Sequence, residues 1–225
     1  MTTLKRVIKT TGDGSQTLYL PDWKEHYHSV HGALAESLHV FIQHGFDRLP
    51  RNLKKAHILE VGFGTGLNAL LSIDRAARQD VRLCYHALEP HPLSEEEVAQ
   101  LNHPQLVSGG KHAGAFQRMH ASTFGTKQMI TSRFEFTLWK QTLEAAGLEP
   151  EFYELVYHDA FAPQFQPDLW GEIALKKIYR SLKSGGILVT YSARGSVKRA
   201  LRACGFNLEH PPGPAGKREI TVAVR

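Results

Sequence analysis

A glycine-rich segment preceded by an acidic residue is the strongest chemical signal in the chain. Residues 60–66 read Glu-Val-Gly-Phe-Gly-Thr-Gly and join a predicted strand to a predicted helix. Glycines at such a junction, here Gly62, Gly64 and Gly66, let the backbone approach a ligand closely. The G-x-G-x-G spacing differs from the G-x-G-x-x-G of dinucleotide sites, and the Glu60 carboxylate would repel a phosphate. S-adenosylmethionine (SAM) has no phosphate and carries a sulfonium and an amino group, so the segment favours SAM over NAD.

A second acidic residue follows the next predicted strand. Glu89 comes directly after residues 82–88, which read as a buried strand. A carboxylate at this position can accept hydrogen bonds from both ribose hydroxyls of a bound nucleoside. The position fits SAM and NAD equally, and a solvated carboxylate at a strand end is the alternative interpretation.

A third group lies after the fourth predicted strand, where residues 159–163 read Asp-Ala-Phe-Ala-Pro. This loop resembles the acid-and-aromatic loops of methyltransferases that act on amino nitrogen. The carboxylate of Asp159 can accept hydrogen bonds from an amine and orient its lone pair, while Phe161 can stack on a base. An ordinary Asp pKa near ~3.9 makes a weak base toward an alkylamine near ~10.4. We therefore expect Asp159 to orient the amine and stabilise charge rather than remove a proton.

Two other kinds of site find little support. His26, His28 and His31 form an H-x-H-x-x-H cluster, but no nearby cysteine or second acidic ligand completes a metal site. We therefore predict no metal. A G-x-S-x-G segment is missing, which disfavours a hydrolase triad.

The chain is basic, with a formal net charge of +5 over 225 residues and 13 histidines besides. This balance favours a polyanionic partner, although many enzymes with small substrates are also basic. Basic side chains are expected on the outward sides of the last two helices and before the final strand. They could follow a phosphate backbone, and the alternative is an ordinary solvated face. The residues are Lys176, Lys177, Arg180, Lys183, Lys198, Arg199, Arg202, Lys217 and Arg218.

The elements that must position these residues can be read from the apolar pattern. A hairpin is predicted within residues 6–20, because alternating segments flank a turn-rich 11–15 and Pro21 closes the second. A helix is predicted from Gly32 to His44, ending near Gly45, because its apolar residues recur at helical spacing.

From His57 onward strands and helices alternate, which is typical of a mostly parallel sheet with helices on both faces. One helix should follow the glycine segment. The next should bury Leu175, Ile178 and Leu182 and stop at Gly185, and Ser196 should cap the last. The strands are expected at residues 58–61, 82–88, 134–139, 152–158, 187–191 and 219–224, the final one antiparallel. The fold class predicted is therefore α/β, Rossmann-like.

Residues 91–132 fit this alternation poorly. They contain an acidic run, a glycine pair and mixed polar and aromatic residues. We expect a partly helical insertion over the carboxyl edge of the sheet, either a lid or a structural elaboration.

Taken together, these motifs resemble one family: the methyltransferase half of the bifunctional tRNA-modifying enzyme MnmC and its stand-alone relatives, called MnmD. The resemblance spans nearly the whole chain. The segments that carry it are residues 17–19, Tyr27-His28-Ser29, residues 32–37 with Glu36, residues 60–68 with Asn68, residues 159–163, residues 167–170, residues 191–195 with Arg194, and Lys217-Arg218-Glu219.

The resemblance implies transfer of a methyl group from SAM to the amino nitrogen of 5-aminomethyl-(2-thio)uridine at the tRNA wobble position. Asp159 and Phe161 would flank the flipped base. SAM would be bound by Glu60, Gly62, Gly64, Gly66, Asn68, Glu89, Gln141 and Asp159. The anticodon stem-loop would be bound by Tyr27, His28, Ser29, Glu36, Lys176, Lys177, Arg194, Lys198, Arg199, Arg202, Lys217 and Arg218. The acid that usually follows the third strand near adenine has no clear counterpart here, and Gln141 is a weak substitute.

The same reasoning gives the expected organisation. Residues 1–225 are predicted to form one methyltransferase domain, with 1–50 as an N-terminal hairpin and helix and 51–225 as the core. We expect no FAD, because the oxidase domain of the bifunctional relatives has no counterpart in this sequence. We expect a cytoplasmic protein with no membrane span, no signal peptide and no obligate protein partner.

Two rival interpretations stay open. One is a small-molecule methyltransferase or an aminopropyltransferase like spermidine synthase, which has the same sheet and an acid after the fourth strand. The other is a catalytically silent RNA-binding module on this fold. Labelled methyl incorporation into tRNA or polyamines, and SAM affinity without product, would separate the three.

Overall fold

The computed structural model describes residues 5–225 and shows two sheets. The large sheet has eight strands in the order β10-β11-β9-β8-β4-β5-β7-β6, and β6 and β11 run antiparallel to their neighbours. Its strands are β4 (Lys55–Val61), β5 (Arg82–Leu88), β6 (Gln128–Thr131), β7 (Phe134–Trp139), β8 (Tyr153–His158), β9 (Leu182–Thr190), β10 (Asn207–Glu209) and β11 (Thr221–Val224). The predicted Rossmann-like α/β class, with its antiparallel last strand, is confirmed.

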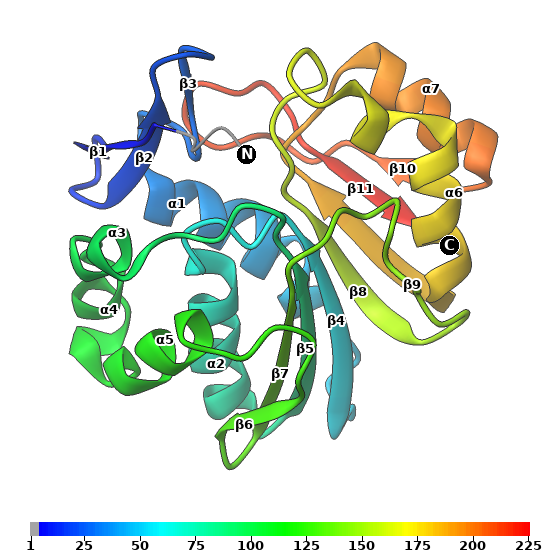
Figure 1. Cartoon of the computed structure of the whole chain (residues 1–225). Coiled ribbons are helices and arrows are strands. Elements are labelled where there is room, and N and C mark those ends of the chain that lie inside the picture. Colours follow the sequence, from blue (N-terminus) through cyan, green and yellow to red (C-terminus); the bar gives the residue numbers. More distant parts are fainter. Residues whose placement is uncertain (1–4) are drawn as a thin grey trace.

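Helices cover both faces of this sheet, because its central strands are apolar on both sides. Figure 1 shows α2 and α5 on one side of the sheet and α6 and α7 on the other. The helices are α1 (Ala33–Ser37), α2 (Leu67–Gln79), α3 (Glu95–Ala99), α4 (His103–Leu106), α5 (Ala113–His120), α6 (Glu172–Ser181) and α7 (Gly195–Cys204), with shorter turns η1 (Leu38–Gln43), η2 (Phe46–Arg48), η3 (Ser108–Gly110) and η4 (Pro167–Trp170). The described residues include no helix that is long and apolar enough to cross a membrane.

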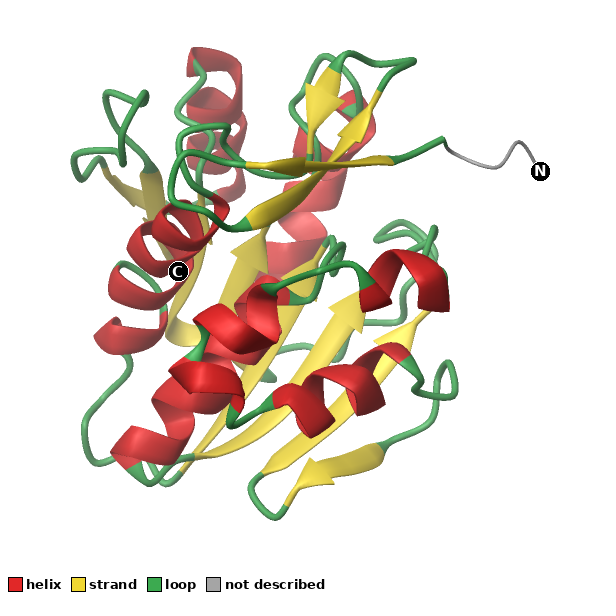
Figure 2. Cartoon of the chain, turned by 90° about the vertical axis from the view of Figure 1, so that its left-hand side faces the viewer, coloured by secondary structure: helices red, strands yellow, loops and turns green. Residues whose placement is uncertain are grey.

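The N-terminal segment forms a small separate sheet. The predicted hairpin is confirmed as β1 (Val7–Thr10) and β2 (Gln16–Leu20), and a short β3 (Glu25–His26) was not predicted. Figure 2 shows this sheet lying beyond the carboxyl ends of the large sheet's parallel strands. The predicted Gly32–His44 helix is α1 continued by the wider turn η1. Residues 1–4, on which the signal-peptide expectation partly rests, lie outside the described residues.

Two helix boundaries differ from the prediction. α6 ends at Ser181, and Leu182 is already extended and paired with Tyr153, so the buried stripe continues from helix into strand. Gly185 and Gly186 lie within β9 and exchange backbone hydrogen bonds with Arg225. Ser196 does not cap α7, because the cap position is Arg194 and no side chain makes a capping hydrogen bond there.

Residues 91–132 are partly helical, as expected. Phe116 and Met119 of α5 are fully buried in the same core as α2, while Val98 of α3 is nearly so. α5 therefore covers a face of the sheet, which agrees with a structural elaboration rather than a lid for this helix.

Candidate active site

Three segments meet at the carboxyl ends of β4, β5 and β8. The backbone amide of Gly62 donates to the Leu88 carbonyl at 3.0 Å, and that of Asp159 donates to the Val61 carbonyl at 3.0 Å. Gly62 has φ +92°, and a Cβ placed on it would lie 2.5 Å from the Asp159 carbonyl oxygen. Only glycine fits this crossing, so the glycine loop lies directly beside the Asp159 loop.

Glu89 ties the glycine loop to the end of β5. One carboxylate oxygen accepts from the Gly64 amide at 2.8 Å, and the other accepts from the His91 amide at 2.8 Å. Gly64 itself has φ +49°, and a Cβ placed on it would meet the Tyr27 ring at 3.1 Å. The carboxylate, the loop and the Tyr27 ring therefore line one continuous surface.

Behind this surface a buried polar chain links Glu60 to Asp159. The Asn68 amide nitrogen donates to Glu60 at 3.0 Å and to Asp159 at 2.8 Å, and the Tyr85 hydroxyl donates to Glu60 at 2.8 Å. Glu60 is fully buried, and this burial raises its pKa well above the usual range. Sequence reasoning placed the Glu60 carboxylate beside the ligand, but in the structure it touches Asn68 and Tyr85 and does not line the cavity.

Asp159 has an unusual environment for a carboxyl group. It is partly exposed to the cavity, yet desolvation raises its pKa to about 7, and the nearby Glu36 charge acts in the same direction. The hydrogen bond from Asn68 opposes these effects. The expectation of an ordinary Asp pKa is therefore wrong. Near neutral pH this group can both hold an amine and accept a proton.

Glu36 and Lys217 form an ion pair opposite Asp159. The Lys217 ammonium lies 2.6 Å from the Glu36 carboxylate and 4.1 Å from the centre of the Tyr191 ring. The Ser29 amide donates to the same carboxylate at 3.2 Å. His28 also lines the cavity, and desolvation lowers its pKa to about 4, so it is neutral at pH 7.

Aromatic rings form the outer wall. The Phe161 ring meets Tyr27 edge-on at 4.9 Å and Trp23 edge-on at 5.3 Å. The backbone of Phe161 is fixed on both sides, since its amide donates to Gln166 at 2.8 Å and its carbonyl accepts from Trp170 at 2.7 Å. The ring at this position is thus held against the cavity by neighbours from three segments.

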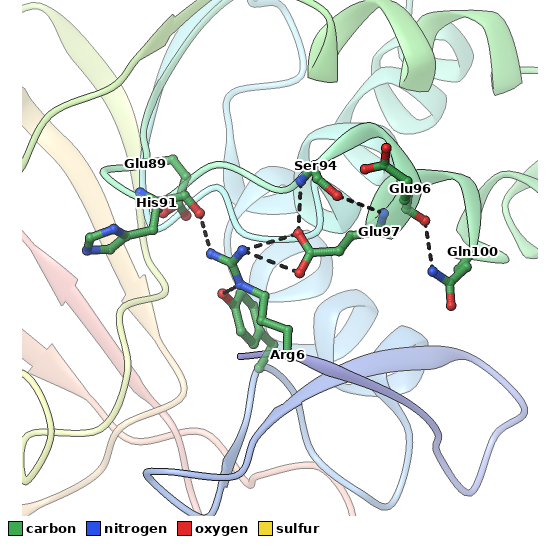
Figure 3. Close-up of polar contacts among 8 residues, drawn as sticks. Arg6, Glu89, His91, Ser94, Glu96, Glu97 and Gln100 are labelled. Atoms are coloured by element: carbon green, nitrogen blue, oxygen red, sulfur yellow. Dashed lines mark hydrogen bonds and ion pairs between the residues drawn. The ribbon is translucent and has the colours of Figure 1, made fainter. Parts of the chain in front are cut away.

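Sequence reasoning missed Arg6, which holds Tyr27 in place. Its guanidinium donates to the Tyr27 hydroxyl at 2.8 Å, to the His91 carbonyl at 2.5 Å and to Glu97 at 3.2 Å. Glu97 is itself fixed by a reciprocal capping box with Ser94 at the start of α3 (Figure 3). No local motif marks this arginine, because its partners lie far away in the sequence.

These residues surround one cavity of about 1830 Å³. Typical small-molecule pockets measure roughly 300–1,000 Å³, so there is room for a methyl donor and a nucleotide together. Of the predicted site residues the cavity brings together Tyr27, His28, Ser29, Glu36, Gly62, Gly64, Asn68, Glu89, Gln141, Asp159, Phe161, Lys176, Lys177 and Lys217. Outside its lining are Glu60, Gly66, Arg194, Lys198, Arg199, Arg202 and Arg218.

Several residues of the predicted basic surface make ion pairs or hydrogen bonds within the protein. Lys198 pairs with Glu219 at 2.6 Å, while Lys176 and Lys177 donate to the backbone carbonyls of Cys204 and Glu144. Lys183, predicted on the helix, lies in β9 and pairs with Glu154. The exposed basic residues among the predicted set are Arg180, Arg194, Arg199, Arg202 and Arg218.

The predicted cofactor can be tested against this geometry. SAM offers an amino group and a ribose, and the site offers matching acceptors. The Asn68 side-chain oxygen is buried and has no hydrogen-bond partner within residues 5–225, so it can accept from an ammonium. Gly64 leaves space that a side chain would fill, and the Glu89 carboxylate beside it can accept from hydroxyls. The residues present fit SAM.

Comparisons with known proteins agree with this fit. A family model described as S-adenosyl-L-methionine-dependent methyltransferase matches residues 115–225. The bifunctional protein MnmC of tRNA 5-methylaminomethyl-2-thiouridine biosynthesis from Cupriavidus metallidurans is 32% identical over 92% of this chain and 32% of the relative. The Magnetococcus marinus MnmC is 32% identical over 96% of this chain and 34% of the relative. The chain thus spans about a third of the length of these relatives.

Solved structures give the same picture. MnmC2 from Aquifex aeolicus matches with a TM-score of 0.77 and 26% identity, over 97% of this chain and 70% of that one. Spermidine synthase from Thermotoga maritima matches with a TM-score of 0.57 and 12% identity, over 97% of this chain and 68% of that one. The second likeness shows a shared fold alone.

Proposed function

Because the chain belongs to the family of SAM-dependent methyltransferases that includes the methyltransferase domain of MnmC, we propose that it methylates wobble uridine in tRNA. The substrate is the aminomethyl nitrogen of 5-aminomethyl-(2-thio)uridine, and the product is the 5-methylaminomethyl form. The name of these relatives, which refers to biosynthesis of 5-methylaminomethyl-2-thiouridine in tRNA, supports this choice of substrate.

One observation carries the proposal. The Asp159 carboxyl and the Phe161 ring share a cavity with the glycine loop, because the Gly62 backbone crosses directly against Asp159. A methyl donor on that loop and an amine on that carboxyl would therefore be neighbours. Methyl transfer needs this close, in-line placement of the two reactants.

We assign SAM to the glycine loop. The Glu89 carboxylate would accept from the ribose hydroxyls, the Asn68 oxygen from the amino group, and Gln141 with the buried Leu143 would lie against adenine. Gly66, the residue before α2, has φ +72° and would shape the loop. Glu60 would act indirectly, by holding the Asn68 side chain in place.

At the reacting amine the chain supplies position and a proton acceptor. SAM, when bound, supplies an electrophilic methyl group. An alkylamine at pH 7 is mostly protonated, and its pKa exceeds that of an ordinary Asp by roughly 6.5 units. With the pKa of Asp159 raised to about 7, this gap falls to roughly 3.5 units. Asp159 would hold the ammonium, take its proton and leave the lone pair free to attack.

The remaining residues would receive the RNA. Phe161 and Tyr27 would contact the flipped uracil, while His28, Ser29 and the Glu36–Lys217 pair would line its entrance. We assign the anticodon stem-loop to a wider basic surface that includes Lys176, Lys177, Arg194, Lys198, Arg199, Arg202 and Arg218. Flipping an unpaired loop nucleotide costs less free energy than flipping a paired one, because no base pair is broken. An anticodon loop is therefore a suitable substrate.

The proposed chemistry needs neither a metal ion nor a flavin, because the methyl donor itself provides the electrophile. We assign residues 1–225 to one methyltransferase domain, with residues 1–50 contributing the small sheet that covers the site. The cytoplasm, where tRNA is modified, is the compartment we propose.

Labelled methyl transfer tests the proposal. The purified chain is incubated with methyl-labelled SAM and tRNA that carries 5-aminomethyluridine, and the nucleosides are identified by mass spectrometry. Asp159→Ala should lower the single-turnover rate at least about 100-fold with little change in SAM affinity. The exposed Glu95→Ala is the control. Label in polyamines instead of tRNA, SAM binding without product, or a parental rate in Asp159→Ala would each contradict the proposal.

A further inference from the structure

Two aromatic side chains, Trp23 and Phe165, line the cavity, and the proposed function gives neither of them a contact with the substrate. Trp23 lies between β2 and β3, and Phe165 lies in the loop after β8. Their rings are stacked, with centroids 5.6 Å apart and planes inclined by 3°. Trp23 also meets Phe161 edge-on, so the stacked pair adjoins the ring assigned to the uracil.

Hydrogen bonds fix the backbone at or beside both residues, and both side chains remain partly exposed. The Phe165 amide donates to the Ala162 carbonyl at 2.8 Å, and Lys24, next to Trp23, closes a turn on the Pro21 carbonyl at 3.3 Å. Trp23 and Phe165 line the cavity together with Tyr27 and Phe161. A stacked pair of flat, partly exposed rings that lines a cavity with room for a methyl donor and a nucleotide is a surface on which another flat ring can stack.

We propose that Trp23 and Phe165 form a stacking platform for the nucleobase adjacent to the methylated nucleotide. The inference rests on the proposed function and adds a second base subsite to it. When the target uridine leaves the loop, its neighbour loses a stacking partner. Aromatic side chains replace such a partner for any base, because every base has a π face. The platform adjoins Phe161, the ring assigned to the flipped uracil, so the nucleobase next to that uracil is the one it would receive.

The competing explanation is a clasp, in which the two rings only fasten the small sheet to the Asp159 loop. A clasp would lower stability and the catalytic rate in Trp23→Ala, whatever RNA is offered. A platform acts on RNA affinity and depends on the neighbouring base. The two explanations therefore separate in kinetics with altered RNA.

The experiment uses an anticodon stem-loop RNA with 5-aminomethyluridine and two matched RNAs in which one flanking nucleotide is abasic. Trp23→Ala should raise KM for the intact RNA on the order of 10-fold, with a much smaller change in kcat and none in SAM affinity. Trp23→Phe should restore most of the affinity. Phe124→Ala is the control, since Phe124 is 44% exposed and lies outside the cavity lining.

A double-mutant cycle decides the matter. One of the abasic RNAs should raise KM for the parent protein as much as Trp23→Ala does, and should add nothing further in that variant. Fully additive effects, or a fall in kcat and stability without a KM change, would overturn the platform.

A readout without turnover separates this inference from the proposed function. Binding of the stem-loop should quench tryptophan fluorescence in the parent chain, and Trp23→Phe should remove the quench while Trp139 and Trp170 remain. A parent chain that methylates the RNA but shows no Trp23-dependent quench overturns the platform alone. A parent chain that binds with the quench but gives no methylated product overturns the proposed reaction alone.

Discussion

At the scale of single residues, the environment that suits Asp159 to its proposed chemistry also lowers the stability of the folded protein. Desolvation and the Glu36 charge disfavour its ionised form, while the Asn68 hydrogen bond favours it. The folded protein therefore binds the Asp159 proton more tightly than the unfolded chain does. Ionisation of this desolvated carboxyl group near neutral pH therefore destabilises the fold. Such a cost is common for catalytic acids and bases.

This conflict predicts a pH-dependent gain in stability for Asp159→Asn. The folded pKa of about 7 lies above the ordinary value of 3.8, so ionisation costs stability progressively between these values. The advantage of the variant should grow from pH 5 to pH 7 by at most about 1.4 kcal/mol per unit and level off above pH 8. Urea denaturation of both proteins across this range measures it. A difference that is constant with pH would show that Asp159 titrates normally.

The residues of the glycine loop give a second prediction at this scale. Gly64→Val should weaken SAM binding strongly, because φ is +49° there and a Cβ would meet the Tyr27 ring at 3.1 Å. Glu89→Ala removes the ribose acceptor and the tether of the loop, and should weaken binding by about 10-fold or more.

Calorimetric titration with SAM measures both effects. Gly147→Val is the control, because the space around Gly147 is open within 4 Å. Undiminished affinity in Gly64→Val and Glu89→Ala together would rule out this placement of SAM.

At the scale of elements, side-chain hydrogen bonds attach the small sheet β1–β3 to the rest of the chain over the site. Arg6, whose side chain is 6% exposed, joins Tyr27 to Glu97 of α3 and to the His91 carbonyl. Asn102 adds a second attachment through hydrogen bonds with Gln16 and Gly14. The position of Tyr27 against Gly64 therefore depends on an element distant in sequence.

Arg6→Ala should loosen this attachment. We expect a loss of about 2 kcal/mol in the free energy of unfolding, because charged hydrogen bonds to partly buried groups are broken. We also expect a several-fold weaker SAM affinity. Arg78→Ala is the matched control, since its ion pair with Asp74 is 65% exposed on the arginine side and worth little. Equal losses of stability and of SAM affinity in Arg6→Ala and Arg78→Ala would show that Arg6 does not hold the small sheet in place.

At the scale of the whole molecule, the proposed RNA surface should be electrostatic. Arg199 and Arg202 are exposed on α7, and the chain carries a net charge of +5. Reversing both charges should weaken tRNA binding and lower the slope of log affinity against log salt by roughly 0.7–0.9 per lost phosphate contact. Lys54→Glu with Arg82→Glu changes the same charge at the amino ends of β4 and β5, away from the site. Equal effects of the two pairs would indicate only general attraction.

The sequence alone determined the order and type of most elements and the strand-end position of the site. Buried parallel strands are continuous apolar runs, and β5 and β7 were predicted with the bounds that the structure has. Since parallel strands end at one edge, the sequence alone places Glu89 and Asp159 together with the glycine loop.

Only the tertiary structure decided the environment of those residues. The pairs that set it, Arg6 with Glu97 and Glu36 with Lys217, are 91 and 181 residues apart in the chain. Periodicity reports the residue's own element, whereas a pKa or a ring stack depends on whatever the fold brings against it. For this reason the sequence-based expectation of an ordinary Asp159 pKa was wrong. The sequence also did not indicate that Glu60 lies behind Asn68, or that Trp23 stacks on Phe165.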